Sequence, residues 1–93
     1  MDKKYIVEYM GTLVIVTAHL LTESNPVIIG IVYFATLFTA EGITDGFFNP
    51  FVPLAKYMLN RGSTEDIMYN LLAQLLGGLS SILLFKPMKT ILD

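Results

Sequence analysis

The residue pair best suited to chemistry in this sequence is Asn49-Pro50, in the middle of the apolar stretch 42–54. An asparagine in front of a helix accepts a hydrogen bond from an orphan backbone N–H, and a proline at the first helical position has no N–H to leave unpaired. The pair therefore predicts the start of a helix. Because Phe47 and Phe48 make the stretch too apolar for an ordinary surface loop, we expect it to dip into a membrane and to begin a short half-helix there.

The Asn49 side chain has two interpretations. In the first, its amide donates a hydrogen bond to a permeating water or small polyol at the N-terminus of the half-helix, where the helix dipole places positive potential that helps to exclude cations. In the second, Asn49-Pro50 is only a turn and a helix cap. The apolar runs on both sides of the pair favour the first interpretation.

The composition indicates a membrane protein of a single domain, residues 1–93. The chain is 54% hydrophobic and 15% charged, with a mean hydropathy of +0.61, whereas soluble domains carry about 25% charged residues. A net charge of -2 gives no basic surface for nucleic acid. The sequence has no cysteine and shows no catalytic triad, phosphate-binding loop or metal-ligand cluster. We therefore expect neither an enzyme nor a cofactor nor a bound metal.

Three hydrophobic runs are long enough, or nearly so, to cross a bilayer, which takes at least about 17 residues. The segment after Asn49-Pro50 is only about ten residues long and reaches about 15 Å, half of the hydrocarbon core. The expected fold is therefore an all-α membrane protein with three transmembrane helices and one re-entrant half-helix. The expected elements are helices over about 5–21, 27–43 and 64–85, the last ended by Lys86-Pro87, and a loop with its half-helix over about 44–59.

The basic residues suggest an orientation for this multi-pass protein. With the N-terminus in the cytoplasm, four basic residues lie inside and two outside; these are Lys3, Lys4, Lys56 and Arg61 against Lys86 and Lys89. The bias is small enough to leave insertion in both orientations open. Small residues within the apolar runs, Gly11, Gly30, Gly77 and Gly78, are candidates for close helix packing in lipid.

Three motifs in the expected order resemble the first half of the major intrinsic protein family, the aquaporins and aquaglyceroporins. The first helix of that family opens with Glu-x-x-Gly-Thr, its first loop reads close to Ser-Gly-x-His-Phe-Asn-Pro-Ala-Val-Thr-Leu-Ala, and its third helix carries Tyr-x-x-x-Ala-Gln-x-x-Gly. The corresponding residues here are Glu8, Gly11 and Thr12; the run 44–55; and Tyr69, Ala73, Gln74 and Gly77. The resemblance covers about residues 5–85.

The resemblance implies roles for several residues. Glu8 would accept hydrogen bonds from the backbone of the re-entrant loop, and Gln74 would hold a loop carbonyl or a partner helix. The alternatives are a Glu8 that reaches the membrane interface and a Gln74 that bonds between helices. The implied pore and loop residues are Asn49, Pro50, Phe51, Val52, Ile29 and Phe47.

The sequence departs from the family at several of these positions. Phe51 stands in place of the alanine of Asn-Pro-Ala, Phe47 in place of histidine, Asp45 in place of glycine, and Ile29 in place of an aromatic residue. The second repeat, which supplies the filter arginine in the family, is missing, and the corresponding residue here is Val52.

Two functions follow as expectations. The first is a pore for water or a small neutral solute, formed in the lipid bilayer when this half pairs with a second half, either an antiparallel second copy or another chain. The second is a non-conducting structural or interaction protein of a cellular or viral membrane. Phe51 and the missing arginine favour the second function. The retained family motifs favour the first. A degenerate fragment without independent function is a third alternative.

Overall fold

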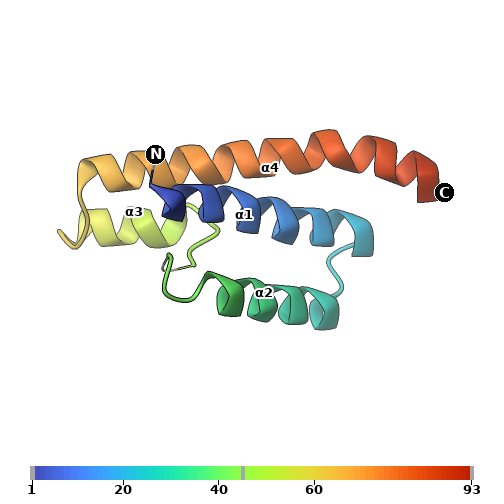
Figure 1. Cartoon of the computed structure of the whole chain (residues 1–93), viewed down its shortest axis with the longest axis horizontal. Coiled ribbons are helices and arrows are strands. Elements are labelled where there is room, and N and C mark those ends of the chain that lie inside the picture. Colours follow the sequence, from blue (N-terminus) through green and yellow to red (C-terminus); the bar gives the residue numbers. More distant parts are fainter. Residues whose placement is uncertain (1, 45, 93) are drawn as a thin grey trace.

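The hydrophobic runs of the sequence form four helices in the computed structural model, which describes residues 2–44 and 46–92 (Figure 1). Their bounds are α1, Lys3–Thr22; α2, Pro26–Ala40; α3, Phe51–Met58; and α4, Thr64–Leu92. The described residues include no strand, so the fold is all-helical. Asp45, which departs from the family pattern, lies outside the described residues.

Helix α1 lies between α4 and α2, and α1 and α4 run in the same direction (Figure 1). The Tyr5 hydroxyl donates to the Asp66 carboxylate at 2.7 Å near the start of both helices, and the Tyr9 and Ser80 hydroxyls lie 2.6 Å apart further along. Between these contacts Gly77 lies directly against α1, so that a Cβ atom there would come within 2.5 Å of the Tyr9 carbonyl oxygen. Gly77 therefore sets how closely the two long helices approach.

Helix α2 packs along α1 and ends three residues before the expected boundary at Ile43. Its start has local support, because the Asn25 side chain accepts from the backbone N–H groups of Val27 and Ile28. Its end is a turn in which Ile43 N–H donates to the Ala40 carbonyl at 3.0 Å. The preceding Gly42 has φ +83°, a left-handed conformation that glycine adopts without steric cost and that stops the helix.

The chain between α2 and α4 enters the fold and returns to the end from which it came. The chain before α3 reaches the buried Phe48, and the eight residues of α3 lead back toward the start of α4 (Figure 1). Eight residues of helix are about 12 Å long. The Ser63 hydroxyl then caps α4 by accepting from the Asp66 N–H at 3.0 Å.

Helix α4 is longer than expected. Lys86-Pro87 does not end it; the helix continues through Pro87 to Leu92 and has 29 residues. A proline inside a helix removes one backbone hydrogen bond but does not forbid the next turn. As a result, the last part of α4 projects beyond the ends of α1 and α2 (Figure 1).

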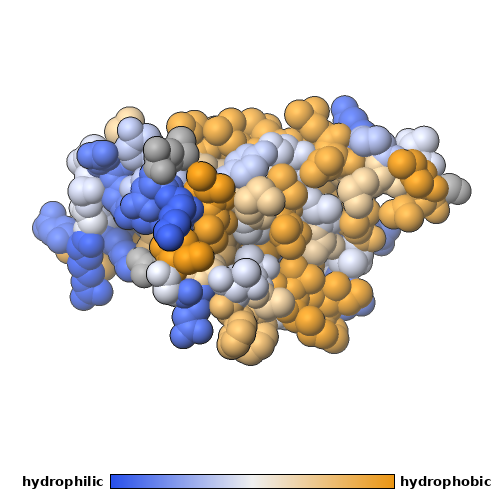
Figure 2. Space-filling view, in the orientation of Figure 1, coloured by the Kyte–Doolittle hydropathy of each residue, from blue (hydrophilic) through white to orange (hydrophobic). Residues whose placement is uncertain are grey.

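Much of the surface is apolar. Figure 2 shows hydrophilic residues gathered at the left, the end that holds the N-terminus and the α3–α4 connection, and hydrophobic residues over much of the rest. Two helices, α1 and α4, are long and apolar enough to cross a membrane, while α2, at 15 residues, is apolar but shorter. By length and composition alone, these helices agree with the membrane protein that the sequence predicts.

Candidate functional site

The site is organised around Glu8, an acidic side chain on α1 with no solvent exposure. Its Oε1 atom accepts from the Phe48 N–H at 2.8 Å and from the Gln74 amide at 3.2 Å, and its Oε2 atom accepts from the Thr44 hydroxyl at 2.6 Å and the Phe47 N–H at 3.1 Å. Burying a carboxylate is costly unless such hydrogen bonds satisfy it. Glu8 thereby ties the loop after α2 to both long helices.

Phe48, the second of the two loop residues bound by Glu8, has a backbone conformation that is rare for a bulky residue, with φ +54°. Its buried ring fits against Gly11 of α1, where an added Cβ would come within 2.5 Å of the ring atom Cδ1, and meets the Tyr33 ring edge-on at 6.1 Å. The space left by Gly11 and the hydrogen bond from the Phe48 N–H to Glu8 both stabilise this conformation. Gly11 therefore packs against the loop, whereas Gly77 packs helix against helix.

Asn49 caps α3 with its carbonyl oxygen and holds the loop with its amide. Oδ1 accepts from the N–H groups of Phe51 and Val52 at 3.0 and 3.3 Å, and Nδ2 donates to the Phe47 carbonyl at 2.8 Å. Pro50 has helical dihedral angles, φ -79° and ψ -16°, although the hydrogen-bonded helix begins at Phe51. One amide hydrogen of Asn49 is thus used inside the loop, which leaves the second for another acceptor.

The start of α3 opens onto a groove of about 650 Å³ between α1 and α4. Asn49 and Pro50 line this groove together with Gln74 and Gly78. The lining residues from the described part of the chain are Thr12, Val16, Phe48, Asn49, Pro50, Leu71, Gln74, Leu75, Gly78, Leu79 and Ile82.

The other predicted pore residues lie elsewhere. Phe51 and Val52 are 74% and 42% exposed at the start of α3, and neither is among the groove-lining residues. Ile29 is half-buried in the first turn of α2. Phe47 is buried at 8% exposure, with its ring beneath the Lys56 ammonium group at 4.9 Å. The structure therefore brings together Asn49, Pro50 and the two support residues of the prediction, but not the whole predicted pore set.

Of the four glycines predicted to pack helices, two have no close neighbour among residues 2–44 and 46–92. A Cβ atom added at Gly30 or at Gly78 would meet no heavy atom within 4 Å. Gly30 is exposed on α2, while Gly78 is half-buried in the groove.

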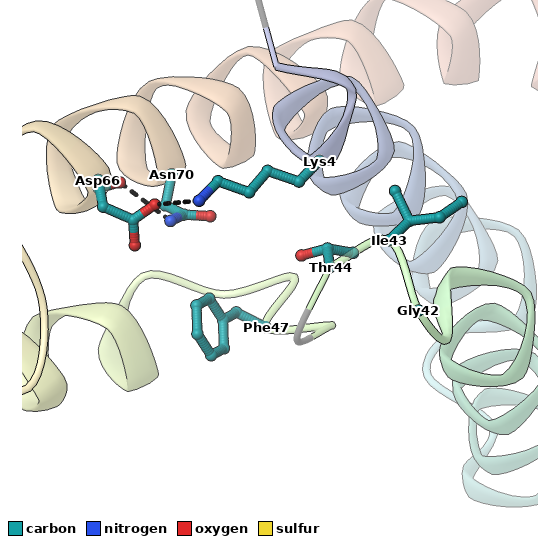
Figure 3. A pocket seen from close by; sticks show the side chains of 7 residues that line it. All are labelled: Lys4, Gly42, Ile43, Thr44, Phe47, Asp66 and Asn70. Atoms are coloured by element: carbon teal, nitrogen blue, oxygen red, sulfur yellow. Dashed lines mark hydrogen bonds and ion pairs between the residues drawn. The ribbon is translucent and has the colours of Figure 1, made fainter.

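A second, polar pocket of about 370 Å³ lies where the N-terminal ends of α1 and α4 meet the loop (Figure 3). The Lys4 ammonium group points across it to the Asp66 carboxylate, 2.9 Å away. Asn70 is buried on the same side and donates to the Asp66 backbone carbonyl at 2.9 Å. Both charged side chains are about one-third exposed, at 37% and 33%, so their ion pair adds little stability.

Sequence reasoning missed the contributions of Thr44, Phe48 and Tyr33. The Tyr33 hydroxyl on α2 donates to the Phe47 carbonyl at 3.0 Å, so the loop is hydrogen-bonded to α2 as well as to α1. Thr44 is 36 residues from its partner Glu8, and no local pattern links the two. A threonine or tyrosine in an apolar run is the only signal that could have marked them, and such residues are common in membrane helices.

Comparisons with protein-family models, with curated proteins and with solved structures give no match to this chain. The resemblance to the major intrinsic proteins therefore depends on the residues themselves. Among residues 2–44 and 46–92, no three histidine or acidic side chains gather where they could hold a metal ion. Hydrogen bonding and apolar burial are the chemistry that this arrangement offers.

Proposed function

We propose that this chain is one half of a membrane channel of the aquaporin type, which conducts water or a small neutral solute once it is paired with a second half. The single observation that supports this most is the buried Glu8. A carboxylate without solvent exposure that binds two consecutive loop N–H groups is a specific device for holding an irregular backbone inside an apolar fold. In lipid, irregular backbone is tolerated only where protein or a water-filled cavity surrounds it.

In the proposed membrane topology, α1, α2 and α4 cross the bilayer and α3 is a re-entrant half-helix. Crossing directions would then alternate along the chain: α1 crosses in one direction, α2 crosses back, and α4 crosses in the direction of α1. This order agrees with the parallel packing of α1 and α4. We place the N-terminus in the cytoplasm, because Lys3, Lys4, Lys56 and Arg61 then lie inside. The loop after α2 would enter the membrane from the cytoplasmic side, and Asn49 would lie inside the membrane at the start of α3.

The start of α3 would supply the selectivity of such a pore. The N-terminus of a half-helix favours partial negative charge and repels cations, and the second amide hydrogen of Asn49 is a donor for a passing oxygen atom. Val52 lacks the charge of the family's filter arginine, and Phe51 is bulkier than the family's alanine. The passenger is accordingly proposed only as a neutral solute no larger than a small polyol.

Osmotic shrinkage of liposomes that contain the purified protein tests conduction. We expect liposomes with the parent chain to shrink faster than empty liposomes. Liposomes with Asn49→Ser, which retains a capping oxygen but removes the amide donor, should shrink more slowly than those with the parent chain. Phe34→Ser, at an exposed position on α2 away from the start of α3, is the control and should conduct like the parent chain. Equal rates in protein-containing and empty liposomes would refute the channel proposal.

One observation favours the second candidate function, a non-conducting anchor or interaction protein. The Phe51 side chain is 74% exposed at the start of α3, where a pore would need open space. If the paired protein conducts neither as the parent chain nor as Phe51→Ala, the non-conducting function replaces the channel.

A further inference from the structure

The polar pocket at the N-terminal ends of α1 and α4 takes no part in the proposed pore. Its volume of about 370 Å³ lies within the range of small-molecule sites, about 300–1,000 Å³. In Figure 3 the side chains of Asp66, Asn70 and Lys4 lie on one side of the pocket, and Thr44 and the Phe47 ring lie across from them. The pocket is therefore large enough for a ligand and has one strongly polar wall.

The buried side chain on this wall has an acceptor without a partner. Asn70 is only 3% exposed, and its amide group donates to the Asp66 backbone carbonyl at 2.9 Å. Its Oδ1 atom accepts no hydrogen bond from the part of the chain that the structure describes. In that part, the unpaired oxygens sealed from solvent are those of Thr12, Thr17 and Gln74, so the Asn70 oxygen is unpaired but accessible. It can accept from an N–H or O–H group of a ligand.

The ion pair beside Asn70 also keeps hydrogen-bonding capacity. The Lys4 ammonium group lies 2.9 Å from Asp66 Oδ1, and the Tyr5 hydroxyl donates to the same oxygen at 2.7 Å. Asp66 Oδ2 accepts no hydrogen bond within residues 2–44 and 46–92. An ammonium group has three hydrogens, and the ion pair uses one of them. Each charged group can therefore bind a ligand without giving up its partner.

The two signs of charge decide which ligands suit the pocket. A ligand with negative charge alone would face the Asp66 carboxylate, and one with positive charge alone would face the Lys4 ammonium group. A ligand that carries both charges can place its cation at Asp66 and Asn70 and its anion at Lys4. Hydrogen bonds between charged partners are about twice as strong as neutral ones, so a zwitterion makes the fullest use of this wall.

We propose that the pocket binds a phosphoethanolamine group, with its ammonium group at Asp66 and Asn70 and its phosphate at Lys4. A primary ammonium group has three N–H donors, which can serve both Asp66 Oδ2 and the unpaired Asn70 oxygen. A choline group has no N–H to donate, and a glycerol group has no positive charge. Both should bind less tightly than ethanolamine.

The same group occurs free in water and as the headgroup of a membrane lipid, and the position of the pocket favours the lipid. The pocket lies at the end of the molecule where hydrophilic residues gather (Figure 2). Ile43, which is 40% exposed, also lines it, so apolar surface reaches its edge. In the proposed topology this end lies at the membrane surface. The choice of a lipid rests on the membrane setting of the proposed function but not on conduction.

Titration of the full chain in detergent micelles with short-chain phospholipids of equal chain length tests the proposal. The side-chain amide signals of Asn70 in NMR spectra report binding at the pocket itself. Phosphatidylethanolamine should bind about ten-fold more tightly or more than phosphatidylcholine and phosphatidylglycerol, because each lacks a charged N–H donor. Free phosphoethanolamine separates the sources: weaker binding than the lipid supports the membrane as the source, and equal binding supports the free compound.

Two matched pairs of variants test the assigned contacts. Asp66→Asn should remove the preference for ethanolamine over choline, whereas Glu65→Gln, at the exposed acid next to it, should retain the preference. Lys4→Gln should weaken the binding of phosphatidylethanolamine about three-fold to ten-fold. Lys3→Gln, at an exposed lysine that does not line the pocket, should leave it unchanged. All four positions are exposed or partly exposed, so the variants should keep the parent's helix content.

The outcomes also separate this proposal from the channel. Equal affinities for the three lipids, or equal effects within either pair of variants, would overturn the headgroup site. A protein that prefers phosphatidylethanolamine but does not conduct supports the site and refutes the channel. A protein that conducts without this preference refutes the site alone.

Discussion

Replacing Glu8 by glutamine exchanges one of the two oxygens that hold the loop after α2 for an NH₂ group. Oε1 faces two N–H donors, from Phe48 and from Gln74, so the new amide places its oxygen there and its NH₂ at the Oε2 position. The Thr44 hydroxyl can rotate and accept from this NH₂, but the Phe47 N–H cannot reverse its role. The substitution therefore leaves the buried Phe47 N–H facing the new NH₂ group, so that two donors meet without an acceptor.

One orphaned buried donor costs about 1–3 kcal/mol, and this is the loss that we expect for Glu8→Gln. Glu8→Ala removes the acceptors of both Phe47 and Phe48, so we expect about twice as much, 2–6 kcal/mol by the same measure. A residue at the membrane interface would show neither loss. The size and the order of the two effects thus test whether Glu8 supports the loop.

The free energy of unfolding, measured by titration of reconstituted protein with SDS, gives these values. Amide hydrogen exchange gives the location: at Phe47 in Glu8→Gln, and at both phenylalanines in Glu8→Ala, exchange should be about ten-fold faster or more, since each 1.4 kcal/mol is a factor of ten. Glu41→Gln, at an exposed acid just after α2, is the control. If Glu8→Gln and Glu41→Gln unfold alike and exchange alike, the reasoning is refuted.

Three further predictions concern helix packing, capping and surface charge. Gly77→Ala should destabilise the fold by about 1–3 kcal/mol, because α1 has to move away, whereas Gly30→Ala should stabilise it by about 0.5–1 kcal/mol in the same titration, because alanine favours helix. Asn49→Ala should cost about 0.5–2 kcal/mol through the lost cap of α3, visible as faster amide exchange at Phe51 and Val52. Lys4→Gln should lower stability by less than about 1 kcal/mol, because both charges of the pair with Asp66 are about one-third exposed, and 1 M salt should reduce the difference between the two proteins.

The starts of the helices were predictable because their signals are local. Asn25 and Ser63 each cap the helix that follows from two or three residues away, and these bonds form in the structure. The ends were less predictable. The expected helix ran to Ile43, past Glu41, yet Gly42 turns the backbone to φ +83° and α2 ends at Ala40. Pro87 is a usual stop signal, yet α4 continues past it.

The site was predictable only where a resemblance supplied the pairing. Glu8 and Gln74 are 66 residues apart, and no periodicity connects them. The direction of the Phe48 ring depends on a left-handed backbone conformation, φ +54°, which composition does not encode for a phenylalanine. The exposure of Phe51 likewise follows from where the first turn of α3 faces, a property of the assembled helices rather than of the sequence around it.

The unequal lengths of the helices have a consequence for the membrane itself. At 1.5 Å per residue, the 29 residues of α4 extend about 43 Å and the 15 residues of α2 about 22 Å, against a hydrocarbon core of about 30 Å. In the proposed topology, a bilayer around this chain would have to thin beside α2. Helix α4 carries Glu65 and Asp66 in its first turn and Lys86 and Lys89 near its end, so only the apolar part between them would lie in the hydrocarbon. Acyl-chain length therefore becomes a variable of the protein's energetics, and the same chain should differ in stability between thin and thick membranes.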